Sequence, residues 1–156
     1  MKNFETNQEN FWAGKFGDDY SLRVTGEDLL ASYISMHSNI IKSTSNINSI
    51  IEFGANIGLN LDAYKILLPN AELSAIEINS KALQELSKKP FIKNIYNKSI
   101  IEYEADYQRD LVLIKGVLIH INPEKLQTVY NNLYNSSKKY ICIAEYYSRN
   151  PEALEY

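Results

Sequence analysis

Short apolar runs alternate with helical stretches along residues 49–145. The apolar runs predict strands at 49–53, 73–78, 93–96, 110–114 and 140–145, and the stretches between them predict helices at 59–68, 80–88 and 123–137. This alternation is typical of βαβ units, which build a parallel sheet with helices on its faces. The run Leu-Val-Leu-Ile at 111–114 is continuous, as in a strand buried on both faces. The pattern predicts an α/β fold.

The segment before the first strand has a different pattern. Residues 1–22 mix polar and aromatic side chains and predict no regular structure, whereas apolar residues at helical spacing predict a helix over 26–42 with Thr25 as its cap. A polar stretch, 42–48, then separates this part from the strands. We therefore expect one domain with an N-terminal helical cap segment, 1–44, and an α/β core, 45–156.

Composition narrows the function classes. The 156 residues carry 16 Lys and Arg against 19 Asp and Glu, a net charge of −3 that argues against a nucleic-acid partner. Two His and one Cys offer no zinc constellation, so we expect no metal. No apolar run reaches the length of a membrane span, and the N-terminus lacks a leader pattern. We expect a soluble, cytoplasmic protein without a membrane partner.

The most informative stretch joins the first strand to the next helix, with Glu52 at the strand end followed by Gly54, Asn56 and Gly58. Such a turn lies at the ligand crevice of a doubly wound sheet, and an acid at the end of the second strand, here Glu77, is placed to bind ribose hydroxyls. The sequence therefore predicts a nucleoside-containing cofactor. The glycine spacing fits neither the dinucleotide loop nor the P-loop. Asn56 can replace a glycine because Asn tolerates a left-handed backbone.

The remaining spacing, acid-x-G-x-x-x-G, resembles motif I of class I S-adenosylmethionine-dependent methyltransferases. The chain as a whole resembles the pseudaminic acid biosynthesis-associated methylase family, in which Asn is the usual residue at the position of Asn56. The segments that carry this resemblance are FWAGKFGDDY at 11–20, EFGANIGLNL at 52–61, AIEIN at 75–79, KGVLIHINPE at 115–124 and AEYY at 144–147.

The resemblance implies a Rossmann-like fold with the parallel sheet order 3-2-1-4-5. It implies S-adenosyl-L-methionine as cofactor and methylation of a small molecule, a sugar or an intermediate of nonulosonic (pseudaminic) acid biosynthesis. Class I methyltransferases continue after the fifth strand with a helix and an antiparallel pair of strands, which we expect this chain to lack. The fifth strand would then be an apolar edge that favours self-association.

The resemblance also assigns roles to residues. Glu52, Gly54, Asn56 and Gly58 would line the methionine end of the cofactor, and Glu77 would hold the ribose. Ile78, Ser99 and Ile100 would contact the adenine, and Lys115 and Gly116 would add backbone contacts near the amino-acid part. Glu77 could instead be a surface acid, and Ser99 an ordinary turn residue.

Candidates for the acceptor side follow the fourth and fifth strands. His120 is the best general base, with a reference pKa near 6.5, although it could simply pack or cap the next helix. Glu145, Tyr146 and Tyr147 could meet substrate hydroxyls, or they could form an ordinary strand end. Trp12 and Tyr20 could pack the N-terminal segment onto the core and close over the site as part of a lid.

Two other functions stay open at this point. One is a nucleoside-binding module, shortened and impaired in turnover. The weaker one is an NAD-dependent oxidoreductase, which the glycine spacing disfavours.

Overall fold

The computed structural model describes residues 4–24, 26–150 and 156. Its helices are α1 (Asn7–Ala13), α2 (Lys15–Arg23), α3 (Glu27–Lys42), α4 (Leu59–Leu67), α5 (Ser80–Ser87) and α6 (Leu126–Ser136), with 3-10 turns η1 (Leu118–His120) and η2 (Pro123–Lys125). Its strands are β1 (Ser49–Phe53), β2 (Glu72–Glu77), β3 (Ile92–Asn97), β4 (Arg109–Lys115) and β5 (Ser137–Ala144).

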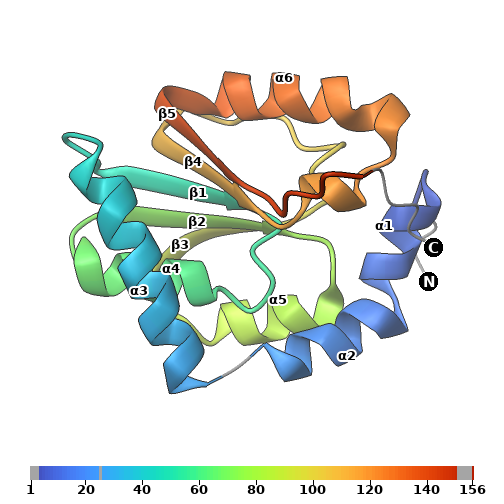
Figure 1. The fold of residues 1–156 in the computed structure, drawn as a ribbon, viewed down its shortest axis with the longest axis horizontal. Helices are drawn as coiled ribbons and strands as arrows, with labels where there is room; N and C mark the ends of the chain where they lie inside the picture. Colours follow the sequence, from blue (N-terminus) through green and yellow to red (C-terminus); the bar gives the residue numbers. More distant parts are fainter. Residues whose placement is uncertain (1–3, 25, 151–155) are drawn as a thin grey trace.

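The strands form one parallel sheet in the order β3-β2-β1-β4-β5, which confirms the predicted fold class (Figure 1). Helices α3, α4 and α5 lie on one side of the sheet and α6 on the other (Figure 1). Because every strand runs in the same direction, their carboxyl ends meet at one edge of the sheet. Helices α1 and α2 lie beside this edge (Figure 1).

Two clusters of buried residues fill the space on either side of the sheet. Ile50 and Leu111 face one cluster, together with Leu61 and Tyr64 of α4. Their sequence neighbours Ile51 and Val112 face the other cluster, which includes Val129 and Leu133 of α6. Successive side chains of a strand point to opposite faces, so strands buried on both faces need continuous apolar runs.

The N-terminal segment differs from expectation, because residues predicted to lack regular structure form α1 and α2. Thr6 caps α1 in a capping box: Glu9 N donates to Thr6 Oγ1 (3.2 Å), and Thr6 N donates to Glu9 Oε2 (2.9 Å). The Thr-x-x-Glu spacing was visible in the sequence. Helix α3 begins after Gly26, while its expected cap, Thr25, lies outside the described residues.

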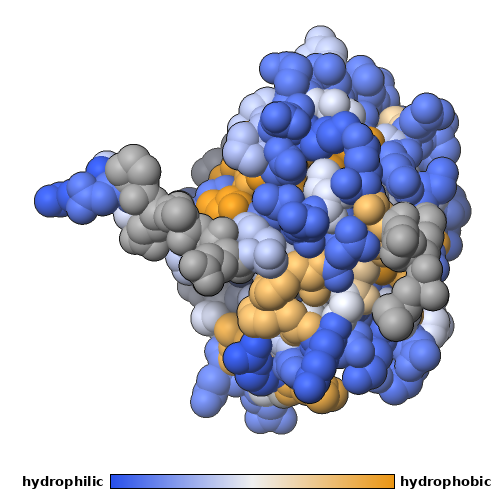
Figure 2. Space-filling view, turned by 90° about the vertical axis from the view of Figure 1, so that its right-hand side faces the viewer, coloured by the Kyte–Doolittle hydropathy of each residue, from blue (hydrophilic) through white to orange (hydrophobic). Residues whose placement is uncertain are grey.

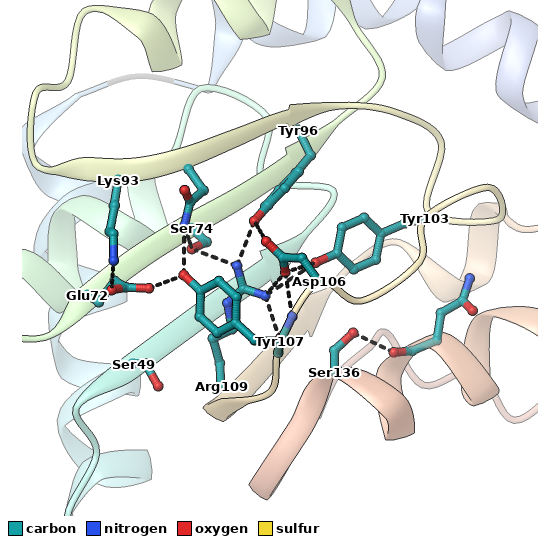
Figure 3. Close-up of polar contacts among 12 residues, drawn as sticks. Ser49, Glu72, Ser74, Lys93, Tyr96, Tyr103, Asp106, Tyr107, Arg109 and Ser136 are labelled. Atoms are coloured by element: carbon teal, nitrogen blue, oxygen red, sulfur yellow. Dashed lines mark hydrogen bonds and ion pairs between the residues drawn. The ribbon is translucent and has the colours of Figure 1, made fainter.

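The stretch 98–108 between β3 and β4 contains no helix or strand and packs around a buried arginine instead (Figure 3). Arg109 is fully buried, donates to Tyr96 Oη (2.7 Å) and to the Tyr107 carbonyl (2.6 Å), and forms an ion pair with Asp106. The Tyr107 ring lies over the guanidinium, with its centroid 3.6 Å away. These contacts hold the loop whose first residues, Ser99 and Ile100 among them, line the pocket described below.

Within the described part of the chain, no helix is both long enough and apolar enough to cross a membrane.

Candidate functional site

A pocket opens at the carboxyl edge of the sheet, between the strand ends and helices α1 and α2. A second hollow adjoins it on the side of β5. Figure 2 views the molecule from this side and shows a hydrophobic patch among hydrophilic residues. The predicted residues that line the pocket are Trp12, Tyr20, Glu52, Gly54, Asn56, Glu77, Ile78, Ser99, Ile100, Lys115, Gly116 and His120. The pocket thus gathers most of the candidate cofactor residues from four strand ends and the cap segment.

The loop after β1 turns through three left-handed residues. The φ angles are 73° at Gly54, 48° at Asn56 and 80° at Gly58, so Asn56 adopts the conformation proposed for it. Its side-chain oxygen accepts a hydrogen bond from Ser21 Oγ (2.7 Å), which links the loop to α2. In the described structure Gly58 lies outside the pocket lining. This position requires glycine because its φ is left-handed and because a Cβ there would lie 2.7 Å from Leu86 Cδ2.

Glu77 joins the ends of β1 and β2. Its Oε2 accepts from Asn56 N (2.7 Å), and its Oε1 accepts from Ile78 N (2.8 Å) and Asn79 N (2.7 Å). Burial raises the pKa of Glu77, and the three amide hydrogen bonds oppose that shift. A carboxylate has about four lone-pair positions, so roughly one is left for an outside donor. Glu77 is therefore a fixed part of the pocket wall and not a surface acid.

Glu52 is almost completely buried, with 1% of its surface exposed. Its Oε1 accepts a hydrogen bond from Asn60 Nδ2 (2.5 Å), while its Oε2 has no hydrogen-bond partner among the described residues. Burial raises the pKa of Glu52 to about 8; the Asn60 bond and the Lys115 charge oppose the shift. The pocket wall therefore holds a carboxyl group that is mostly protonated at neutral pH.

The adenine-side candidates lie where β2 and β3 end. Ser99 and Ile100 are buried at 2% and 7% exposure and line the pocket together with Ile78. Ser99 Oγ also accepts from Ile101 N (3.1 Å), so it shapes the turn in which it stands. At the end of β4, Gly116 has a φ of 64° and Lys115 Nζ lies 4.3 Å from the centroid of the Tyr33 ring.

His120 stands in η1 inside an aromatic group. Its ring centroid is 4.6 Å from that of Trp12, and its Nδ1 is 2.8 Å from Tyr156 Oη. Burial lowers the pKa of His120, and Glu145 partly opposes this shift. A neutral imidazole can accept a proton, so the geometry permits the base role. Trp12 also stacks edge-on with Tyr20, at 5.3 Å between ring centroids.

The three residues after β5 have different surroundings. Glu145 Oε1 accepts from Val117 N and Leu118 N (both 2.9 Å), which fastens η1 to the end of β5, and its buried Oε2 has no partner in the described structure. Glu145 and Tyr146 line the second hollow. Tyr147 is 86% exposed and lies outside both hollows as the described residues form them. The structure therefore does not bring Tyr147 to the site.

The pocket and the second hollow share one wall. The residues that line both are Trp12, Tyr20, Tyr33, Lys115, Gly116 and His120. A ligand in the pocket and a ligand in the hollow would therefore meet at the end of β4, beside His120.

Sequence reasoning missed several residues that build the site. Asn79 caps α5, and its Nδ2 also donates to Asp18 Oδ1 (2.9 Å) and to the Trp12 carbonyl (3.2 Å), which holds α1 and α2 against the core. His37 is fully buried, and its Nε2 lies 2.9 Å from Asn60 Oδ1. No local sequence pattern predicts contacts between residues so far apart in the sequence.

Among the described residues, no three His, Cys, Asp or Glu side chains are grouped so that they could hold a metal ion.

The sequence matches no known family model and no curated protein. Many solved structures share the fold. One is the plantazolicin methyltransferase BpumL in complex with SAH: it is 18% identical, the TM-score is 0.69, and the match covers 87% of this chain and 56% of that one.

Two other proteins with this fold are sugar methyltransferases. The sugar N-methyltransferase KedS8 from Streptoalloteichus sp ATCC 53650 is 12% identical with a TM-score of 0.72, over 96% of this chain and 59% of that one. SAM-bound CalS10, an amino pentose methyltransferase from Micromonospora echinaspora, is 8% identical with a TM-score of 0.69, over 96% of this chain and 60% of that one. The chain thus spans less than two thirds of these neighbours' lengths, and it has the Rossmann-like fold that these methyltransferases share.

Proposed function

We propose that this protein is a methyltransferase that uses S-adenosyl-L-methionine and acts on a small molecule. One observation carries the proposal: the left-handed loop 54–58, Glu77 and Glu52, whose Oε2 has no partner among the described residues, converge on one pocket at the carboxyl edge of a methyltransferase-type sheet. Neighbours of the same fold were solved with SAH or SAM. The pocket offers an acid for a ribose and another for an ammonium group, which fits this cofactor.

In this proposal each side chain binds or orients a defined part of the cofactor. Glu77 accepts a ribose hydroxyl with its remaining lone pair, and Ile78, Ser99 and Ile100 border the adenine. Glu52 and the loop of Gly54 and Asn56 face the amino-acid end, beside Lys115 and Gly116. When bound, S-adenosylmethionine supplies an activated methyl group. The chain's contribution is alignment, because the sulfonium leaving group departs readily.

The second hollow is the proposed acceptor site. Its wall meets the pocket at Lys115 and Gly116, so an acceptor lying there would face the methyl end of the cofactor. His120 could take the proton of an attacking hydroxyl or ammonium group, and Glu145 Oε2 and Tyr146 could bind hydroxyls. This lining suits a sugar, and with the family resemblance it supports an acceptor from nonulosonic (pseudaminic) acid biosynthesis.

Binding and turnover are tested separately. Calorimetric titration with S-adenosylhomocysteine should show one site, and Glu77→Gln should weaken it at least ~10-fold, because an amide cannot accept all three backbone bonds. Mass spectrometry of nonulosonic pathway intermediates incubated with the protein and S-adenosylmethionine should then show addition of a methyl group. Binding without methylation of any acceptor would favour the nucleoside-binding module, and tighter binding of NADH would favour the oxidoreductase.

Self-association through β5 is a second part of the proposal. In the described structure β5 pairs only with β4, and its side chains Ile141 and Ile143 are 39% and 53% exposed. An apolar strand with a free edge can pair with another copy. Light scattering should show dimers or larger species, and Ile143→Lys should shift them toward monomer. A stable monomer at high concentration would contradict this part.

A further inference from the structure

The strongest unexplained feature of the pocket is a chain of buried polar groups behind it. It runs from His37 in α3 to Asn60 in α4 and on to Glu52 in β1, with distances of 2.9 Å and 2.5 Å between the bonded atoms. Exposure is 0% for His37, 8% for Asn60 and 1% for Glu52. Buried polar groups are costly unless each has a partner. In the described structure His37 Nδ1 and Glu52 Oε2 have none, and of these two residues only Glu52 lines the pocket, so its open position can be filled by a ligand.

The direction of each hydrogen bond follows from the chemistry. In the structure Asn60 Nδ2 donates to Glu52 Oε1, so Asn60 Oδ1 is the atom left to accept a hydrogen bond on the other side. His37 Nε2 therefore carries a proton and donates it to Asn60 Oδ1. Burial lowers the pKa of His37 to about 4, so the ring is neutral and its Nδ1 has no proton. The Nε2–H tautomer of His37 and the orientation of the Asn60 amide toward Glu52 are therefore coupled.

We propose that His37 is a positioning residue for Glu52: acting through the Asn60 amide, it holds the carboxyl group so that Oε2 receives the ammonium group of the cofactor's amino-acid part, and binding expels the carboxyl proton to solvent. This inference rests on the proposed function. The O–H bond of neutral Glu52 breaks, the proton leaves to water, and the resulting carboxylate pairs with the ligand ammonium. No electron transfer is involved.

The charges around Glu52 support this assignment. Lys115 on β4 favours the carboxylate, whereas Glu77 on β2 and Asp62 on α4 disfavour it. Lys115 Nζ itself lies over the Tyr33 ring and is not among the hydrogen-bond partners that the described residues provide for Glu52. A ligand cation beside Glu52 Oε2 would therefore lower the pKa of Glu52 and favour its ionised form.

Two ligands separate this role from general binding. S-adenosylhomocysteine carries the ammonium group, and 5′-methylthioadenosine has the same nucleoside without it. Calorimetry at pH 7 in buffers of different ionisation enthalpy should show release of about 0.9 proton with the first ligand, because a group with a pKa of about 8 is largely protonated there, and none with the second. Affinity for S-adenosylhomocysteine should fall by close to tenfold for each pH unit below 7.

Three variants test His37 itself. His37→Phe keeps a flat ring against Tyr64, whose centroid is 4.2 Å away, but removes the donor to Asn60. It should weaken S-adenosylhomocysteine about tenfold at pH 7, the equivalent of about one pKa unit at Glu52, and leave methylthioadenosine unchanged. His37→Gln can still donate to Asn60 and should restore the affinity. Tyr64→Phe, which removes a buried hydroxyl without a partner in the described structure, is the matched control and should change neither ligand.

The outcomes are distinct. If both ligands bind the wild type without proton release, or if His37→Phe weakens both equally, the positioning role is overturned while the proposed cofactor stands. If neither ligand binds the folded wild type, the proposed function falls and this inference falls with it.

Discussion

Replacing Glu52 with Gln should change how the stability of the ligand-free protein depends on pH. The folded-state pKa of Glu52 is about 8 against an ordinary value of 4.5, so between these values the folded chain binds a proton that the unfolded chain does not. Stability from such a group is fully present below pH 4.5 and is lost as the pH rises through 8. One pKa unit corresponds to about 1.4 kcal/mol, and the group is already half deprotonated at pH 8, so the wild type should lose about 1.6 kcal/mol relative to Glu52→Gln between pH 6.5 and 8.

His37 shifts stability in the opposite direction at lower pH. Its pKa falls from 6.5 to about 4 on folding, so the unfolded chain binds the extra proton and acid destabilises the fold between those values. In the wild type the two effects nearly cancel from pH 6.5 down to pH 5. In Glu52→Gln only the effect of His37 remains, so that variant should lose stability on acidification over the range in which the wild type changes little.

Urea unfolding followed by circular dichroism, at half-unit steps from pH 5 to 8.5, measures both curves. All other titrating groups are common to the two proteins, so the difference between the curves isolates Glu52. If the two proteins change in parallel between pH 6.5 and 8, Glu52 has the same protonation in the folded and unfolded states over this range, and the argument from its burial is wrong.

Three further substitutions test the fold around the site. Gly17→Ala should displace α1 from α2, because the new Cβ would come 1.9 Å from the carbonyl oxygen of Trp12. We expect the free energy of unfolding to fall by about 3 kcal/mol and the fluorescence emission of Trp12 to shift to longer wavelength. Unchanged emission would contradict this packing. Asn56→Ala should lower the free energy of unfolding by about 2 kcal/mol, because alanine strains the left-handed backbone and the hydrogen bond from Ser21 is lost. Asn56→Gly loses only the hydrogen bond and should cost about half as much. Equal losses for the two variants in urea unfolding would refute the role of the backbone. Arg109→Met should cost about 3 to 5 kcal/mol, because it leaves buried partners unpaired. Lys93→Met, which removes an exposed ion pair, should leave the stability nearly unchanged, and an equal loss for both variants would be inconsistent with the buried cluster.

The sequence predicted the sheet well because each strand is a short apolar run between turn residues. The bounds of β1 agree with the prediction at both ends, and β4 extends it by one residue at each end. Strand β5 was the least accurate, since it begins at Ser137 with Lys138 and Lys139, whose polarity hides the start of an edge strand. Helices α1 and α2 were missed because glycines and scattered aromatics obscure the period of such short helices.

The candidate site was predictable where its residues directly follow a strand or stand at a strand end. The loop 54–58 and Glu77 follow from spacing and from the known position of strand ends. The partners of Glu52 and Glu145 did not follow, because they depend on where α3, α4 and η1 meet the strand ends in space. For Gly58 and Tyr147, a place in a motif suggested ligand contact, whereas in the described structure neither lines the two hollows: Gly58 packs against Leu86, and Tyr147 is exposed.

Three acids at the carboxyl edge explain how the site could be divided between two ligands. Glu77 has both oxygens occupied by backbone amides, whereas Glu52 and Glu145 each keep one buried oxygen without a partner in the described structure. An unpartnered buried oxygen lowers stability, and apolar residues would fill these positions at lower cost. One open oxygen lies at the pocket and the other at the second hollow, on either side of the shared wall at Lys115 and Gly116. Two unpartnered oxygens lower the stability of the fold and give it nothing in return. They are useful to a protein that must bind a methyl donor on one side of the shared wall and a polar acceptor on the other.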